Sequence, residues 1–308
     1  MKILLVGGSG FLGAWVARFL NINQCLARIF DPNKPDSEWH RLSGIRADAT
    51  DWVAGDVSKK SELDDAIRDC EGVINLAGLL TPECSQNPVR GAEVNLIGAI
   101  NVFEGALKHG LKKLAYTSSI GVYGPDHAEF PEPTTHYGSF KLASEGVARA
   151  FYKEHGISSL GVRPFVVYGP GREIGGSAGP SIACRMAAQG QAYQIPFTGL
   201  TGFVYAGDVA AILCQAMLED FQGAPLINMP GITATVKDFI LEIQHQMPDA
   251  ILSSESSPLP VFGKIPTEVS WPLSNNHEPT PLRIGIAKTL EYYKSGNINL
   301  RTVMMCFD

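Results

Sequence analysis

Residues 1–13 read MKILLVGGSGFLG, and the organisation of the chain can be worked out from this segment. Lys2–Val6 is a short, nearly unbroken apolar run, which predicts a strand covered on both faces. Helical spacing of apolar residues begins at Phe11 and continues to Leu20. A glycine-rich turn joins the two. The segment therefore predicts a strand, a tight turn and a helix in immediate succession.

The glycines of this turn follow the pattern Gly7-x-x-Gly10-x-x-Gly13. The first permits a tight turn, the second permits close approach of a pyrophosphate, and the third lets helix and strand pack closely. The helix N-terminus adds free N–H donors. A glycine-rich turn can also lack a ligand, but its place directly after a buried-type strand favours a dinucleotide. Phe11 and Leu12 are expected to contact it too.

Asp31 ends the second expected strand, Leu26–Phe30, eighteen residues beyond Gly13. A carboxylate there can accept hydrogen bonds from both ribose hydroxyls and would repel a 2′-phosphate, which favours NAD over NADP. The alternative is a turn-forming aspartate before Pro32. Basic Arg28 lies nearby, as does Lys34. Asp56, with Val57, follows a third expected strand and is a candidate for the adenine side.

Strands and helices alternate through the first half of the chain. Further expected strands are Gly72–Gly78, Lys113–Ser118 and Ser159–Val167 (broken by Pro164), and the long expected helices are Val89–Gly110 and Tyr137–His155. This alternation predicts an α/β fold with a Rossmann-type, doubly wound parallel sheet. We assign residues 1–170 to an NAD-binding domain, completed by residues from about 203–230.

Residues 171–308 are expected to form mostly a small substrate-binding part, interleaved with the end of the sheet. Gly171–Pro180 has four glycines and is expected to be a mobile loop. Helices are expected over 208–219, 236–247 and 282–293. Pro258–Pro281 is rich in Pro and Ser and is expected to wrap the surface.

Composition excludes several classes of protein. The 308 residues are 45% hydrophobic and 18% charged, which is typical of a globular protein and not of a disordered one. A formal net charge of −6 argues against a broad nucleic-acid surface. No apolar run is long enough for a membrane span. Six scattered cysteines form no metal or disulfide pattern, so we expect no metal and a cytoplasmic location.

Tyr137 and Lys141 are spaced i, i+4 and share one face of the expected helix. A free phenol has a pKa near ~10, and a neighbouring ammonium lowers it, which would make Tyr137 a usable acid/base group. The alternative is a surface aromatic beside a solvated lysine. Ser118 and Ser119 end the preceding strand, where side chains point into the cleft above a parallel sheet.

Together these motifs resemble the extended short-chain dehydrogenase/reductases, also called the NAD-dependent epimerase/dehydratase family, over roughly residues 1–220. The motifs that carry the resemblance are Gly7–Gly13, Gly55-Asp56-Val57, Asn75-Leu76-Ala77-Gly78, Asn95, Thr117–Gly124, Tyr137-x-x-x-Lys141 and Arg163–Pro170. The resemblance implies that Ser119, Tyr137 and Lys141 are catalytic. It also implies that Leu76, Ala77, Gly78, Ser118 and Pro164 line the cofactor site.

The sequence departs from the sugar-nucleotide members of that family. Ser119 is followed by Ile120-Gly121 and not by the Asp-Glu pair of the similar 4,6-dehydratases. Val166 stands where many members have an asparagine. Residues 200–208 lack the arginine that contacts a diphosphate in many members. These differences point to a smaller substrate without a diphosphate.

Arg172 and Arg185 could clamp a substrate carboxylate, although surface charge is an equal alternative. Thr81 and His136 could also face the substrate, as could Ser119. The leading hypothesis is an NAD-dependent oxidoreductase acting on a small polyhydroxylated or sugar-acid-type alcohol. The alternatives are a nucleotide-diphosphate-sugar 4-epimerase with tightly bound NAD, and a non-catalytic dinucleotide sensor. The resemblance also implies a homodimer through the two long helices.

Overall fold

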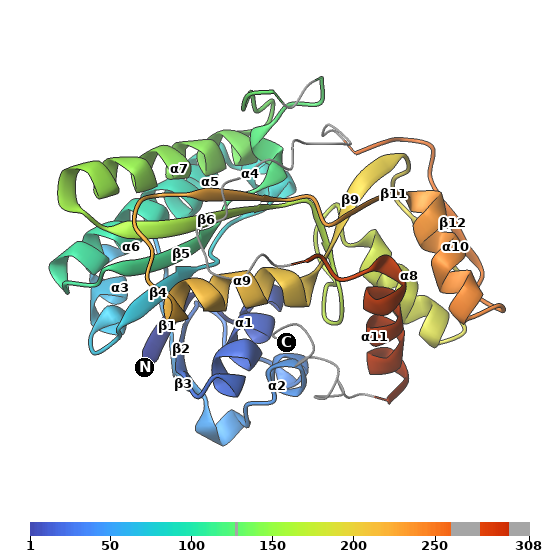
Figure 1. The fold of residues 1–308 in the computed structure, drawn as a ribbon, viewed down its shortest axis with the longest axis horizontal. Helices are drawn as coiled ribbons and strands as arrows, with labels where there is room; N and C mark the ends of the chain where they lie inside the picture. The colour runs from blue at the N-terminus through green and yellow to red at the C-terminus, as the bar shows by residue number, and fades with distance from the viewer. Residues whose placement is uncertain (127–128, 260–277, 296–308) are drawn as a thin grey trace.

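A seven-stranded, wholly parallel sheet forms the centre of the computed structural model, which describes residues 1–126, 129–259 and 278–295 (Figure 1). The strand order is β10-β6-β5-β4-β1-β2-β3. The strands are β1 (Lys2–Val6), β2 (Leu26–Phe30), β3 (Asp51–Val53), β4 (Gly72–Asn75), β5 (Lys113–Thr117), β6 (Ser158–Pro164) and β10 (Leu226–Met229). The order reverses between β1 and β4. The doubly wound parallel sheet predicted from the sequence is therefore confirmed.

Helices cover both faces of this sheet (Figure 1). One face carries α1 (Phe11–Ile22) and α9 (Ala206–Leu218), with α2 (Ser37–Ser43) packed on α1. The opposite face carries α3 (Lys60–Ile67), α6 (Gly98–Lys108) and α7 (His136–His155). Two short helices, α4 (Thr81–Gln86) and α5 (Pro88–Ala92), and a π-helical turn, Glu93–Ile97, precede α6.

The unbroken apolar run of β1 is explained by these two layers. Ile3 and Leu5 enter the core beneath α1 and α9, whereas Leu4 and Val6 enter the core beneath α3 and α6. All four side chains are fully buried. Because successive side chains of a strand point to opposite faces, a strand covered on both sides must be apolar at every position.

A smaller part of the fold follows β6. It contains a three-stranded sheet ordered β11-β9-β7 and a two-stranded β12-β8 pair. Its elements are β7 (Val166–Tyr168), α8 (Gly179–Ala188), β8 (Tyr193–Ile195), β9 (Leu200–Tyr205), β11 (Ile232–Thr235), α10 (Val236–Gln246), β12 (Leu252–Ser254) and α11 (Leu282–Ser295). Short 3-10 turns lie at Ala47–Ala49 and Ile120–Val122.

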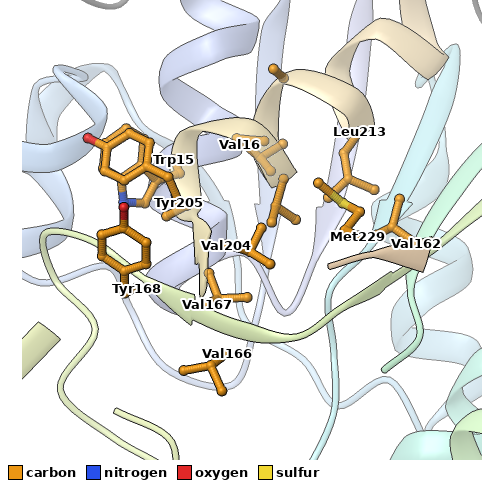
Figure 2. Close-up of a cluster of buried hydrophobic side chains, with 14 of the residues drawn as sticks. Trp15, Val16, Val162, Val166, Val167, Tyr168, Val204, Tyr205, Leu213 and Met229 are labelled. Atoms are coloured by element: carbon orange, nitrogen blue, oxygen red, sulfur yellow. The ribbon is translucent and has the colours of Figure 1, made fainter. Parts of the chain in front are cut away.

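Aromatic packing joins the two parts of the fold. Figure 2 shows Trp15 of α1 next to Tyr205, with Tyr168 beside them. The Trp15 and Tyr205 rings meet edge to face with centroids 5.4 Å apart, and Tyr168 and Tyr205 lie 5.7 Å apart. The small part therefore shares one continuous core with the large sheet.

Three expectations need correction. The strand expected over Ser159–Val167 is two strands in different sheets, because Pro164 has no N–H to extend the ladder and the chain turns away at Phe165. The helix expected over Val89–Gly110 is interrupted by the π-helical turn. The loop expected over Gly171–Pro180 ends earlier, since α8 begins at Gly179. Most of the expected surface wrap, residues 260–277, lies outside the described residues.

Candidate active site

A cleft of about 1070 Å³ lies beyond the carboxyl ends of β1 and β4, where the strand order reverses. In doubly wound sheets, this position is the one where ligands bind. All of the residues predicted to bind the cofactor line it: Gly7, Gly10, Phe11, Leu12, Gly13, Asp31, Asp56, Val57, Leu76, Ala77, Gly78, Ser118, Tyr137, Lys141 and Pro164. The fold therefore brings together residues that are up to 157 positions apart in the chain.

The glycine turn leaves room for a phosphate at one position and none at the other two. Gly7 has a φ of +72°, and a Cβ there would lie 2.6 Å from the Ala77 backbone. A Cβ on Gly13 would lie 2.0 Å from the Gly8 carbonyl oxygen. At Gly10 the nearest described atom is 3.6 Å away. The turn is thus a cradle that is open at Gly10 and faces the first turn of α1, as a dinucleotide pyrophosphate requires.

Asp31 is fixed at the edge of this turn. Its two carboxylate oxygens accept hydrogen bonds from the backbone N–H groups of Asn33, at 2.9 Å, and Ser9, at 3.2 Å. Burial raises the pKa of Asp31, and these hydrogen bonds oppose that effect. Each oxygen can accept a further bond. The carboxylate is therefore held facing the cleft, where the sequence predicts a ribose.

Asp56 also lines the cleft, but it already has partners. Arg90 lies 2.5 Å from one carboxylate oxygen, and the other oxygen accepts bonds from the N–H and the hydroxyl of Ser58. Burial raises the pKa of Asp56, and these contacts outweigh burial and lower it overall. An adenine-side role for Asp56 remains a prediction.

Tyr137 is positioned by the start of α7. Thr135 caps this helix by accepting a bond from the Gly138 N–H at 3.1 Å. A Cβ on Gly138 would lie 2.1 Å from the carbonyl oxygen of Gly121, so the helix end is pressed against the loop that follows Ser119. Tyr137 and Ser119 are hydrogen-bonded through their side chains. The predicted acid/base group and its serine therefore meet in the cleft.

Lys141 lies one turn further along α7. Its ammonium donates to the Thr117 carbonyl at 2.8 Å and lies 5.8 Å from the centre of the Tyr137 ring. Its side chain is buried, and burial lowers the pKa of Lys141 to about 8, although Cys84 and Glu145 act in the opposite direction. The ammonium therefore lies near the Tyr137 ring, and both side chains line the cleft.

A second cation acts on Tyr137. Burial raises the pKa of the Tyr137 phenol, whereas the Ser119 hydrogen bond and the Arg172 guanidinium lower it. Arg172 comes from a loop 35 residues away in the sequence. The effect of Lys141 on this phenol remains a prediction.

A buried charged network lies behind the candidate catalytic residues. Ser118 donates to Glu145 at 2.5 Å, and Glu145 is paired in bidentate fashion with Arg163 at 2.7 and 2.5 Å. Arg163 also donates to the Tyr123 hydroxyl at 2.8 Å. Glu145 is completely buried. This network joins α7 to the ends of β5 and β6, the elements that carry the three catalytic candidates.

The five substrate candidates divide into two groups. Thr81, Ser119 and Arg172 line the cleft. His136 and Arg185 are not among its lining residues: His136 stacks on Phe140 with ring centres 6.2 Å apart, and Arg185 is bonded to Glu173 at 3.0 Å. The prediction that His136 and Arg185 contact a substrate is untested, and neither side chain lines this cleft.

Arg172 is the most informative of these residues. Its guanidinium lies over the Phe11 ring, 5.7 Å from the ring centre, and burial lowers its pKa. Its Nε is inaccessible to solvent and has no hydrogen-bond partner among the described residues. A buried N–H without a partner costs about 1–3 kcal/mol. An anionic group in the cleft could pair with the guanidinium, since Arg172 lines the cleft.

The sequence analysis missed α2 and its contribution to the cleft. Trp39 lines the cleft and donates from its ring nitrogen to the Gly8 carbonyl at 2.8 Å, which ties α2 to the phosphate turn. A signal was present, because Asp36 caps this helix and Glu38 lies in its first turn. Arg90 was also missed, since nothing in the sequence links it to Asp56.

Residues 3–228 match the sequence model of the NAD dependent epimerase/dehydratase family. The chain belongs to this family, is one of its enzymes, and uses NAD, whose pyrophosphate the open cradle at Gly10 fits. The resemblance to the extended short-chain dehydrogenase/reductases is thereby confirmed. Among the described residues, no helix is long and apolar enough to cross a membrane.

The chain is similar in sequence to one epimerase and in fold to two solved enzymes. The UDP-glucose 4-epimerase of Azospirillum brasilense is 26% identical over 274 residues, 79% of this chain and 77% of the relative. The structure of the Thermotoga maritima UDP-glucose 4-epimerase with UDP-glucose has a TM-score of 0.82 at 23% identity and covers 96% of this chain and 99% of that one. The L-threonine dehydrogenase from Clostridium difficile has a TM-score of 0.81 at 17% identity and covers 97% and 99%.

Proposed function

We propose that this enzyme is an NAD-dependent dehydrogenase that oxidises a small polyhydroxylated or sugar-acid-type alcohol. NAD, when bound, would supply the hydride acceptor for the substrate carbon. Tyr137, as the phenolate, takes the proton of the same alcohol group, and Ser119 donates a hydrogen bond to the substrate oxygen. Lys141 and Arg172 place positive charge near this phenolate, which stabilises it before it accepts the proton.

The observation that carries the proposal is the position of Arg172. A guanidinium whose buried Nε has no described partner lies in the same cleft as Tyr137 and acts electrostatically on its phenol. Guanidinium groups bind carboxylates through paired N–H donors. A substrate carboxylate on Arg172 would hold the alcohol carbon near Tyr137 and Ser119, which fits a hydroxy acid.

A second observation argues against a sugar nucleotide. Residues 200–208 hold β9 and the start of α9, and they contain no arginine. Val166, in place of the asparagine of many family members, lines the cleft. The chain therefore lacks both the arginine and the asparagine that bind the substrate in many sugar-nucleotide members of the family.

The test is formation of reduced nicotinamide, followed by absorbance, with NAD and a panel of aldonates, uronates and other hydroxy acids. We expect steady turnover with at least one acid, and a KM for it that rises about tenfold or more in Arg172→Ala because a charge-assisted bond is lost. An Arg68→Ala variant is the matched control, since that side chain is 65% exposed and does not line the cleft. No turnover of any acid would contradict the proposal.

The alternative is a nucleotide-diphosphate-sugar 4-epimerase, and the names of the relatives favour it. An epimerase keeps its NAD and shows no net redox change. Interconversion of UDP-glucose and UDP-galactose without added NAD, together with silence on free acids, would select this alternative. Retention of NAD through dialysis would support the same outcome.

The homodimer stays part of the proposal. Its surface would be α7 with the α5–α6 segment, where Val89 and Ile97 are large apolar side chains with 71% and 44% exposure. Sedimentation equilibrium would show a dimer that Ile97→Asp weakens. A monomer at micromolar concentration would contradict it.

A further inference from the structure

We propose that Tyr293, near the end of α11, is a positioning residue that holds the Arg172 loop against the cleft and thereby sets the affinity for an acidic substrate. This inference rests on the proposed function for the identity of the substrate. The positioning itself concerns only contacts within the chain, and it can be measured separately.

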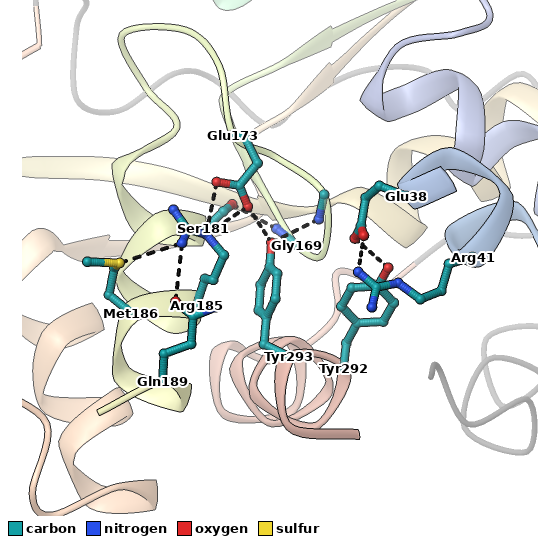
Figure 3. Close-up of polar contacts among 11 residues, drawn as sticks. Glu38, Arg41, Gly169, Glu173, Ser181, Arg185, Met186, Gln189, Tyr292 and Tyr293 are labelled. Carbon is teal, nitrogen blue, oxygen red and sulfur yellow. Dashed lines mark hydrogen bonds and ion pairs between the residues drawn. The ribbon is translucent and has the colours of Figure 1, made fainter. Parts of the chain in front are cut away.

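Tyr293 contacts the two residues that flank Arg172 in the sequence, and Figure 3 shows its contact with Glu173. Its hydroxyl accepts a bond from the Gly171 N–H at 3.0 Å and donates one to Glu173 at 2.9 Å. One hydroxyl therefore binds the residue before Arg172 and the residue after it. The arginine between them points into the cleft, where its Nε has no described partner.

The backbone around Arg172 needs such a restraint. Gly171 and Gly175 have φ values of +86° and +104°, so glycines in unusual conformations flank the arginine on both sides. Glycine loses more conformational freedom on ordering than any other residue. Bonds that fix this loop therefore offset a large entropic cost. Other side chains also contact this loop: Trp15 of α1 donates to the Pro170 carbonyl at 3.1 Å, and from α8 Ser181 accepts from Gly169 and Arg185 binds Glu173.

The neighbouring tyrosine provides an internal control. Tyr292 donates to Glu38 of α2 at 2.5 Å, and the Arg41 guanidinium lies 5.0 Å from its ring centre (Figure 3). Among the described residues, its hydroxyl makes no hydrogen bond to residues 169–178, and Tyr292→Phe removes the same chemical group from the same helix. A change that is seen in Tyr293→Phe and absent from Tyr292→Phe is therefore specific to the loop.

The first arm of the test measures hydrogen exchange over residues 169–178 in the full chain. We expect faster exchange in Tyr293→Phe, because the Gly171 N–H loses its acceptor, and wild-type exchange in Tyr292→Phe. Equal exchange in Tyr293→Phe and the wild type would overturn the proposal regardless of any substrate.

The second arm measures kinetics on the acid identified above. Tyr293→Phe should raise KM about tenfold with little change in kcat, since a bond to a charged group is lost at the loop and not at the reacting carbon. In the Arg172→Ala background the same change should have no further effect. If Arg172→Ala raises KM and Tyr293→Phe does not, positioning by Tyr293 is wrong and the proposed function stands. If neither variant changes KM, substrate binding by Arg172 is wrong and so is this inference.

Discussion

Burial favours the uncharged form of both Tyr137, which is half-buried, and Lys141, which is buried. It raises the pKa of Tyr137 and lowers that of Lys141 to about 8. Perturbed groups of this kind gather at functional sites. Two contacts oppose the effect of burial on the Tyr137 phenol, the Ser119 hydrogen bond and the Arg172 charge.

The Tyr137→Phe variant tests the acid/base role. We expect NAD binding to persist and kcat to fall by roughly 10²–10⁴-fold, the usual contribution of a general acid or base. Fluorescence titration with NAD and steady-state assays give the two quantities. Full activity in this variant would show that another group takes the proton.

Lys141→Met tests the burial of the ammonium through the pH dependence of stability. The folded-state pKa of about 8 lies below the ordinary 10.5, so the unfolded chain holds more protons between these values. Wild-type stability should therefore rise with pH relative to the variant, by on the order of 3 kcal/mol from pH ~7 to above ~10.5. Urea unfolding across this range measures the difference. A difference that is independent of pH would contradict the burial.

Asp31→Ala tests the choice of cofactor. Loss of a carboxylate that can accept from the ribose should weaken NAD binding about tenfold and improve the relative use of NADP. Asp48→Asn, an exposed carboxylate paired with Arg46, is the control. An unchanged ratio of NADP to NAD use in Asp31→Ala would show that this carboxylate does not select the cofactor.

Residues whose chemistry is local could be predicted from the sequence. Gly7, Asp31 and the Tyr137/Lys141 pair each follow from a spacing within one strand–turn–helix unit. The influence of Arg172 on Tyr137 could not be predicted, because it depends on a loop that folds back over the cleft. The unsatisfied Arg172 Nε is likewise visible only in three dimensions.

At the scale of elements, the Glu145–Arg163 pair joins the elements that carry the candidate catalytic residues. It joins α7 to β6, and through Ser118 to the end of β5. A buried ion pair is weak evidence for added stability, but removal of one partner leaves an uncompensated charge. We therefore interpret this pair as fixing the register of the helix that carries Tyr137 and Lys141.

Glu145→Gln should lower the free energy of unfolding by about 3–5 kcal/mol, because Arg163 is left buried without its carboxylate. Glu154→Gln is the matched control, since this glutamate of the same helix is 70% exposed. Chemical denaturation measures both. A similar small effect in the two variants would show that the pair is not important for stability.

Elements with a strong apolar period were predictable, and those defined by tertiary contacts were not. The strands β1, β4 and β5 and the helix α7 follow their sequence patterns. The short strands β8, β11 and β12 did not stand out, since each has only three or four residues and is partly exposed. The π-helical turn Glu93–Ile97 interrupts a pattern that reads as one regular helix.

At the scale of the molecule, the cleft lies at the carboxyl edge of the parallel sheet and is lined by both parts of the fold. The phosphate turn and α2 line it together with the Arg172 loop, whose guanidinium lies over Phe11. The chain after residue 170 is joined to the large sheet, since β10 returns to that sheet and α9 packs on α1. The segments that line the cleft therefore share one core.

The measurement that tests the account most directly is a crystal structure of the protein with NAD. We predict the pyrophosphate on the turn at Gly10, the adenosine ribose on Asp31, and the reactive face of the nicotinamide beside the Tyr137 hydroxyl. A nicotinamide ring distant from Tyr137, or a pyrophosphate bound away from the glycine turn, would contradict the account.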